Sequence, residues 1–246
     1  PLWKLYGGKS GDVPVYASGI NLTNPTDIAS KALELGYCGL KLKIGFGQKR
    51  DCENLAALRH LAGDKICLMA DANQAWQLDE ALVMSDALAK FDLDWLEEPI
   101  ATDRPLQEWK SLKKAASMPI AAGENISGEQ DFDIVINDNI LTVIQPDLAK
   151  WGGLSKTIPI AKNIIAAGKR YCPHYLGGGI GLVASAHALA AVGGDGILEV
   201  DINPNPLRTN LVGDMLTLVP GMASLGSLPG LGYEPDLATL KKYQVL

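Results

Sequence analysis

The chain has 246 residues, of which 47% are hydrophobic and 20% charged, and its formal net charge is −6. These proportions are ordinary for a folded globular protein and exclude a disordered chain. The acidic balance argues against nucleic acid as a partner, and no apolar run reaches the roughly 18 residues of a membrane span. A length of about 250 residues suits two ordinary domains or one complete α/β barrel.

The first residues have the character of an interior segment. Residues 1–12 begin Pro-Leu-Trp, without an initiator Met, and contain no signal-peptide core. We therefore expect them to be a linker that follows an N-terminal domain outside this sequence.

Short β-rich runs alternate with helical patterns along the chain. The predicted strands are 13–17, 39–44, 66–70, 93–96, 120–122, 141–144, 170–173 and 197–200. Between them apolar residues recur at helical spacing, as at Leu55, Leu58, Leu61 and Ala62, and at Leu78, Ala81, Leu82, Ser85 and Ala89. Pro159 weakens the helix expected after Gly153 unless it lies in the first turn.

Strands that alternate with helices pair in parallel through right-handed crossovers. Eight such units without a Gly-x-Gly-x-x-Gly fingerprint favour a closed (β/α) barrel over an open doubly wound sheet. We expect this barrel to occupy residues 13–202. Residues 203–246 are rich in Pro and Gly and contain no ninth unit, so they are expected to pack outside the barrel or on the N-terminal domain.

Each predicted strand after the first ends near an ionisable side chain. The series is Lys43, Asp71, Glu97, Glu124, Asp147, His174 and Glu199, with gaps of 23 to 28 residues between neighbours. One strand–helix unit of a barrel has about that length, and the active sites of barrel enzymes lie at the strand C-termini. The period therefore predicts that all seven groups lie on one rim.

Lys41 and Lys43 are two residues apart on a strand, so both should point into the barrel mouth. Two ammonium groups buried together need anions nearby, and the pairing is expected to lower the pKa of one of them, as a general base requires.

Asp71, Glu97 and Glu124 come from three consecutive units. Three converging carboxylates repel one another, and salt bridges to Lys41 and Lys43 would neutralise only two of them. Oxygen ligands of this kind suit Mg²⁺, with Mn²⁺ as a substitute, so the residues predict a metal site.

Asp147 and His174 end successive strands, so the carboxylate can orient the imidazole. Glu199 faces the same mouth, where a protonated carboxyl could donate to a developing oxyanion. The other two histidines, His60 and His187, lie in helical patterns, where packing or solvation explains them.

Taken together, these motifs resemble the enolase superfamily and, within it, the mandelate racemase subgroup. The motifs are Lys-x-Lys at 41–43, Asp-Ala-Asn at 71–73, Glu-Glu-Pro at 97–99, Gly-Glu-Asn at 123–125, Gln-Pro-Asp at 145–147 and the strand-ending His174. The resemblance covers residues 11–201. It implies a TIM-like barrel of the (β/α)7β type, and an N-terminal α+β capping domain that is absent from this chain.

The resemblance also implies roles for the residues. Asp71, Glu97 and Glu124 would be the metal ligands, and Glu98 would support them without binding the metal. Lys43 would be the base on one face of a small carboxylate substrate. His174, oriented by Asp147, would be the acid or base on the other face. The substrate carboxylate and the enediolate would be bound by Lys41, Glu199 and Asn73, together with Lys43 and His174.

A sibling subgroup, with dipeptide epimerases and muconate cycloisomerases, has a lysine where Asp147 stands. The Asp147–His174 pair therefore favours the racemase-like branch. Lys150, three residues further on, is expected to be structural or a surface group.

Two outcomes of enolate formation remain open in this branch. Loss of a β-hydroxyl would dehydrate a sugar acid to a 2-keto-3-deoxy acid, which we favour because it is the commoner outcome for this arrangement in the family. Reprotonation from the opposite face would instead racemise or epimerise a 2-hydroxy acid.

Two other readings are weighed against these. The glycine-rich run at 177–181 could bind phosphate at a helix N-terminus, as in a phosphosugar enzyme, but this leaves the acids unexplained. A barrel kept as a non-catalytic scaffold has no reason to hold all seven groups.

The cysteines show neither a CxxC pair nor a disulfide framework. Cysteine spacing of this kind predicts free thiols and a cytoplasmic location. We also expect a homo-oligomer. The four residues are Cys38, Cys52, Cys67 and Cys172.

Overall fold

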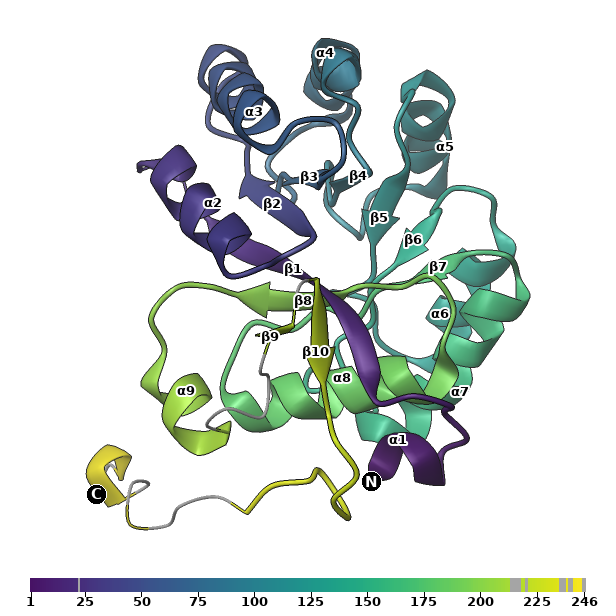
Figure 1. The fold of residues 1–246 in the computed structure, drawn as a ribbon. Coiled ribbons are helices and arrows are strands. Elements are labelled where there is room, and N and C mark those ends of the chain that lie inside the picture. Colours follow the sequence, from purple (N-terminus) through teal and green to yellow (C-terminus); the bar gives the residue numbers. More distant parts are fainter. Residues whose placement is uncertain (22, 213–217, 220, 235–237, 239–240, 245–246) are drawn as a thin grey trace.

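The computed structural model describes residues 1–21, 23–212, 218–219, 221–234, 238 and 241–244. Its centre is a curled sheet of short strands with helices around the outside (Figure 1). The eight strands of the sheet are β1 (Asp12–Ile20), β2 (Gly39–Lys43), β3 (Cys67–Asp71), β4 (Trp95–Glu97), β5 (Ile120–Ala122), β6 (Val143–Ile144), β7 (Arg170–Tyr171) and β8 (Leu198–Asp201).

All eight strands run parallel, in the order β7-β6-β5-β4-β3-β2-β1-β8. The predicted barrel is therefore confirmed. Strands β7 and β8 stand at the two ends of this order and approach each other closely. A Cβ at Gly196 would collide with the carbonyl oxygen of Tyr171, so only glycine allows this approach.

Helices surround the sheet, and each follows a strand except α1, which precedes β1. The helices are α1 (Leu2–Leu5), α2 (Pro25–Glu34), α3 (Gln48–Ala62), α4 (Leu78–Leu88), α5 (Leu106–Ala115), α6 (Glu129–Asn137), α7 (Gly153–Ala166), α8 (Gly179–Val192) and α9 (Pro206–Val212), with 3₁₀ turns η1 (Ala89–Phe91) and η3 (Lys241–Tyr243).

Most of the predicted helix stripe on α3 faces the core, but Leu61 does not. Leu55 and Leu58 are buried, whereas Leu61 is 40% exposed. The prediction for Leu61 was wrong because it lies roughly 90° around the helix from the line of its buried neighbours. In α7, the helix continues through Pro159, which lies beyond the first turn. It does so although proline cannot donate a backbone hydrogen bond there.

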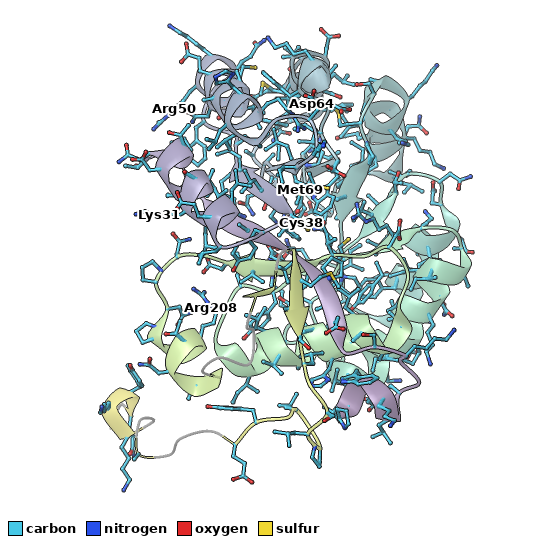
Figure 2. All side chains as sticks on the ribbon, viewed as in Figure 1. Lys31, Cys38, Arg50, Asp64, Met69 and Arg208 are labelled. Carbon is cyan, nitrogen blue, oxygen red and sulfur yellow. The ribbon has the colours of Figure 1, made fainter. Side chains whose placement is uncertain are left out.

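The inside of the barrel is apolar at the end where the strands begin. Tyr16, Met69, Trp95, Val143 and Ile197 form a buried cluster there, and Tyr16 packs edge-on against Trp95 with ring centroids 5.5 Å apart. Figure 2 shows Met69 near the centre of the molecule, while Lys31 and Arg50 project from the outer helices. This cluster supports the strands below the charged residues of the mouth.

Helix α8 is apolar on all sides because other elements surround it. It packs against α1, α7 and α9. His187 in this helix is fully buried. Its Nδ1 accepts a hydrogen bond from the amide of Trp3 at 3.2 Å, and its Nε2 lies 3.1 Å from the carbonyl oxygen of Leu231. Packing thus explains His187, whereas His60 is exposed.

After β8 the described chain adds α9 and two short strands instead of another parallel strand. Strand β10 (Met222–Ser224) pairs antiparallel with the start of β1 and with β9 (Leu218–Val219). No helix in the described part of the chain is both long and apolar enough to cross a membrane. All four cysteines are free thiols.

Candidate active site

The seven predicted rim residues lie at one end of the barrel. Lys43, Asp71 and Glu97 are the last residues of β2, β3 and β4, and they occupy one register across the sheet. Glu124, Asp147 and His174 lie two or three residues beyond the ends of β5, β6 and β7, and Glu199 lies within β8. The parallel sheet therefore places six of them at or just beyond the strand C-termini, and Glu199 inside β8 beside them.

Lys41 is enclosed by carboxylates beneath this rim. Its side chain is fully buried, and its Nζ lies 2.7 Å from Glu97 Oε1, 2.7 Å from Glu199 Oε1 and 3.6 Å from Asp71 Oδ2. Burial lowers the pKa of Lys41, but Glu199 and Glu97 raise it by more, so the net pKa lies well above its usual range. The lowering expected for one lysine of the pair therefore does not occur at Lys41, because the surrounding carboxylates outweigh burial.

Lys43 is the more accessible lysine, with 15% of its side chain exposed and its Nζ 2.5 Å from Asp71 Oδ2. Burial and the nearby Glu97 raise the pKa of Asp71, while Lys41 and Lys43 lower it by less. The anions required by two adjacent lysines are thus present, and Lys43 is the member of the pair that can reach the mouth.

Glu97 is held by neutral donors as well as by Lys41. Trp95 Nε1 donates to its Oε2 at 3.0 Å, and Gln145 Nε2 donates to the same oxygen at 2.8 Å. Trp95 precedes Glu97 by two residues on β4, so both point into the barrel. Sequence reasoning missed both donors, although the same two-residue spacing could have indicated Trp95.

His174 connects three carboxylates on the far side of the mouth. Its Nδ1 lies 2.8 Å from Asp147 Oδ2, its Nε2 makes a short contact with Glu124 Oε2, and Glu199 Oε2 lies 3.8 Å from Nε2. Burial lowers the pKa of His174, but Glu199, Asp147 and Glu124 raise it by more, to about 10. The predicted Asp147–His174 pair is therefore formed, and the imidazole is protonated at neutral pH.

Glu199 lies between the two sides of the site and is ionised. Besides Lys41, it accepts hydrogen bonds from Ser18 Oγ at 2.6 Å and from the amide of Tyr175 at 3.2 Å. Burial raises the pKa of Glu199, but Lys41 and His174 lower it by more. The lowered pKa therefore does not support Glu199 as a protonated donor, and Ser18 is a contact that sequence reasoning missed.

Glu124 has a second cation beside it. Lys150 Nζ lies 3.1 Å from Glu124 Oε1 and 3.3 Å from Asn125 Oδ1, and 45% of its side chain is exposed. Burial raises the pKa of Glu124, but His174 and Lys150 lower it far below its usual range. Lys150 is thus partly a surface group, as expected, but it also touches the site.

Glu98 is buried beside the rim, with its backbone in the left-handed region at φ 39°. Its carboxylate accepts hydrogen bonds from Gln74 Nε2 and Asn125 Nδ2. Burial raises the pKa of Glu98 to about 7, with Glu124 as the next cause. Asn73 is exposed on the loop after β3, and its backbone N–H donates to Asp71 Oδ1 at 2.8 Å.

The three acids offer only oxygen donors, the chemistry that a hard divalent cation prefers. In this arrangement each already binds a cationic side chain: Asp71 binds Lys43, Glu97 binds Lys41 and Glu124 binds His174. Within the described residues, no three acidic, histidine or cysteine side chains converge enough to share one ion. The donor set fits Mg²⁺, which would have to compete with these side chains.

The glycine-rich run after β7 has a role that does not require phosphate. A Cβ at Gly177 or Gly181 would collide with the ring of Tyr175, and the Tyr175 hydroxyl interacts with the backbone of Gly178 and Gly181. This hydroxyl occupies the N-terminus of α8, where a phosphate would bind, which weighs against a phosphosugar site.

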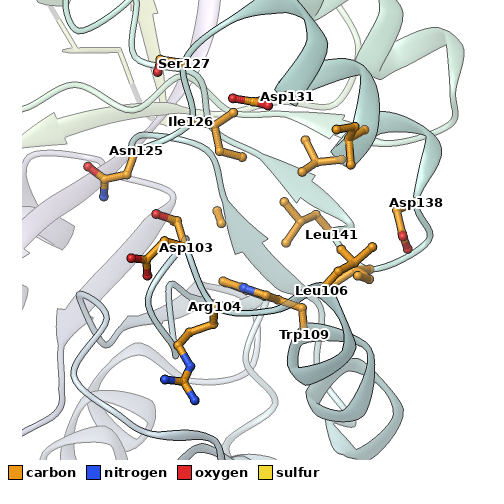
Figure 3. A pocket seen from close by; sticks show the side chains of 15 residues that line it. Asp103, Arg104, Leu106, Trp109, Asn125, Ile126, Ser127, Asp131, Asp138 and Leu141 are labelled. Atoms are coloured by element: carbon orange, nitrogen blue, oxygen red, sulfur yellow. The ribbon is translucent and has the colours of Figure 1, made fainter.

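A separate hollow of about 340 Å³ lies between α5 and α6, and none of the seven rim residues lines it. Figure 3 shows Trp109, Ile126 and Leu141 along it, and Asn125 at the end nearest the mouth. Its lining is mainly apolar, so it lacks the charged groups that define the rim.

Fold and rim together define a barrel of the enolase superfamily. Residues 26–239 match the family described as "Enolase C-terminal domain-like", and the chain belongs to this family. The chain is 31% identical to D-galactarolactone cycloisomerase of Agrobacterium fabrum, covering 98% of this chain and 68% of the relative. It is 30% identical to arabinonate dehydratase of Saccharolobus solfataricus, covering 99% and 67%.

Solved structures show the same fold. A mandelate racemase/muconate lactonizing enzyme from Bordetella bronchiseptica RB50 superposes with a TM-score of 0.96 at 51% identity, covering 98% of this chain and 68% of that one. A racemase from Streptomyces coelicolor A3(2) with bound magnesium has a TM-score of 0.87 at 32% identity, covering 98% and 66%. The predicted superfamily and subgroup are confirmed, and the chain is related to lyases, isomerases and racemases.

Proposed function

We propose that this protein removes the proton next to a carboxylate of a sugar acid and then eliminates water, giving a 2-keto-3-deoxy acid. The observation that carries this proposal is the placement of Lys43 and His174 on opposite sides of the mouth. In the barrel, β2 and β7 are three strands apart by way of β1 and β8, and five by way of β3 to β6. A substrate between them would meet a base on one face and an acid on the other.

The proposed chemistry divides between the two sides. Lys43 takes the α-proton, and the electrons of the broken C–H bond pass into the substrate carboxylate as an enediolate. The β C–O bond then breaks, His174 gives its proton to the departing hydroxyl, and water and an enol result. The enol tautomerises to the 2-keto acid.

The carboxylates around His174 support elimination over racemisation. Glu199 and Asp147 raise the pKa of His174 and lie outside the proposed metal set, and Glu124, one of the proposed ligands, raises it as well. A protonated imidazole suits protonation of a leaving group, whereas racemisation in both directions needs a neutral imidazole as base for one of them.

We further propose Asp71, Glu97 and Glu124 as ligands of Mg²⁺, or Mn²⁺ in its place. The oxygen donor set supports this, as does the magnesium in the similar racemase structure. When bound, the ion supplies positive charge that stabilises the enediolate. Lys41 stays beneath the site, where it holds Glu97 and Glu199 in place.

The test is to incubate the complete protein and Mg²⁺ with a panel of aldonic and aldaric acids and to measure 2-keto acid. We expect keto acid from at least one acid, and none with a Lys43→Ala variant. Exchange of the α-hydrogen with solvent, without keto acid, would contradict dehydration and indicate a racemase or epimerase. Release of keto acid from lactones or anhydro sugars alone would instead indicate a cycloisomerase, as in the galactarolactone relative.

A further inference from the structure

Two residues that our proposed mechanism leaves without a role, Glu98 and Asn125, connect three successive strand ends. Asn125 Nδ2 lies 2.9 Å and 3.0 Å from the two carboxylate oxygens of Glu98, and 3.0 Å from Glu124 Oε1. On the other side of Glu98, Gln74 Nε2 donates to Oε2 at 3.0 Å. The contacts therefore run from the loop after β3, through the end of β4, to Glu124 after β5.

The backbone of Glu98 is fixed in an uncommon conformation. Its φ of 39° lies in the left-handed region, which non-glycine residues seldom adopt and which persists only where the surroundings enforce it. Here the backbone N–H of Glu98 donates to the carbonyl oxygen of Ala121 at 3.0 Å. The backbone carbonyl of Glu98 accepts from the backbone N–H of Gln74 at 2.7 Å. In this conformation the buried carboxylate of Glu98 accepts hydrogen bonds from Asn125.

Contacts at both polar atoms of its side chain, Nδ2 and Oδ1, fix the orientation of Asn125. While Nδ2 faces the two carboxylates, Oδ1 accepts a hydrogen bond from Lys150 Nζ at 3.3 Å. The amide cannot rotate by 180° without placing its oxygen against the Glu98 carboxylate, which would replace attraction with repulsion. The donor that touches Glu124 Oε1 is therefore fixed by Glu98.

We infer that Glu98 and Asn125 are positioning residues that set the orientation of the Glu124 carboxylate for the divalent ion. The inference rests on the proposed role of Glu124 as a ligand. Partners that hydrogen-bond to metal ligands typically change metal affinity by about 10- to 100-fold when they are removed. Because both residues act on Glu124, the effect should appear in metal affinity before any substrate is added.

The experiment measures the dissociation constant of Mn²⁺ in the complete protein, by electron paramagnetic resonance of free Mn²⁺ and without substrate. We expect Asn125→Ala to weaken binding by about tenfold. Glu98→Gln should weaken it too, because one carboxylate oxygen becomes an NH₂ group facing the donors of Asn125 and Gln74. The matched controls are Asn137→Ala and Glu129→Gln on the surface of α6, whose polar contacts are with Asp133 and Lys156; neither should change the affinity.

A third variant, Glu124→Gln, separates the inference from the proposed function. If it abolishes Mn²⁺ binding while Asn125→Ala and Glu98→Gln, folded as judged by circular dichroism, bind as the wild type does, the positioning inference is wrong and the metal site stands. If Glu124→Gln itself binds Mn²⁺ normally, the ligand assignment is wrong and the inference fails with it. A Glu98→Asp variant that binds more tightly than Glu98→Gln would support an electrostatic and hydrogen-bonding role over simple packing.

Discussion

The two ends of this barrel are built from the same eight strands but are held together differently. At the end where the strands begin, side chains such as Tyr16, Met69 and Trp95 pack in an apolar cluster. At the other end, buried Lys41, Glu97 and Glu199 are held by ion pairs and hydrogen bonds. A buried charge is tolerated only with such partners. The charged end therefore depends on ion pairs and hydrogen bonds, whereas the apolar end depends mainly on packing and meets the charged end where Trp95 donates to Glu97.

The largest expected effect tests the charged end. His174→Asn should lower the rate of keto-acid formation by about 10³-fold, within the usual range for loss of a general acid or base. Exchange of the α-hydrogen, which needs Lys43, should persist in this variant. The comparison uses His60→Asn, an exposed histidine, as its control. Retention of more than a tenth of the wild-type rate would show that His174 is not the acid.

The next effect tests the apolar end. Met69 is fully buried, and Met69→Ala should reduce the free energy of unfolding by about 3 kcal/mol because a cavity replaces its contacts. Thermal denaturation gives the stability, and Mn²⁺ titration of the folded variant should give the wild-type affinity. A large loss of Mn²⁺ affinity would break the distinction between the two ends.

Metal binding should stabilise the folded protein by an amount that rises with the logarithm of the free Mg²⁺ concentration once that exceeds the dissociation constant. At 100 times its dissociation constant, Mg²⁺ should add about 2.7 kcal/mol to the free energy of unfolding, and chelation with EDTA should remove both this increment and the activity. In Asp71→Asn the melting temperature should no longer depend on Mg²⁺. An unchanged Mg²⁺ response in that variant would exclude Asp71 as a ligand.

The smallest effect concerns His187, a buried histidine in the outer helix α8 and outside both ends of the barrel interior. Burial lowers the pKa of His187, and the hydrogen bond to the carbonyl of Leu231 raises it by less. The folded state therefore binds fewer protons than the unfolded chain below the unfolded pKa of about 6.5. The contribution of His187 to the free energy of unfolding is lost as the pH falls below that value. Above it, His187 does not make the free energy of unfolding depend on pH.

Melting temperatures between about pH 5 and pH 8, a range that spans the ordinary histidine pKa, test this sign. In His187→Gln the melting temperature should fall less steeply as the pH is lowered below about 6.5. Glutamine can still donate and accept a hydrogen bond but does not titrate in this range. His60→Gln should leave the profile unchanged. An acid limb equally steep in wild type and His187→Gln would show that His187 is not its source.

The periodic features of the sequence predicted the barrel well. Strand 120–122 was predicted at the bounds that the structure shows, and the other seven differ by a few residues at their ends. Alternation of strands and helices is a local signal, and parallel pairing follows from it. Lys43, Asp71 and Glu97 could be placed on one rim from their spacing alone, because the strand C-termini of a barrel share one face.

Contacts among residues far apart in the chain could not be predicted in this way. Ser18 binds Glu199 across 181 positions, and Gln145 binds Glu97 across 48. Nothing in the local pattern around Ser18 distinguishes it from any strand residue, and the Gln-Pro-Asp motif at 145–147 does not reveal that Gln145 contacts Glu97. The left-handed backbone of Glu98 was equally hidden, because non-glycine residues carry no sequence signal for it.

The sequence by itself determined the type of fold and which ionisable groups lie on the rim, since both follow from periodicity and residue chemistry. Only the tertiary structure decided their protonation. The surroundings raise the pKa of Lys41 and of His174, which favours their protonated forms, and lower the pKa of Glu199, which favours its ionised form. The reason is physical: a pKa depends on burial and on every charge within a few ångströms, and those neighbours come from strands that only folding brings together.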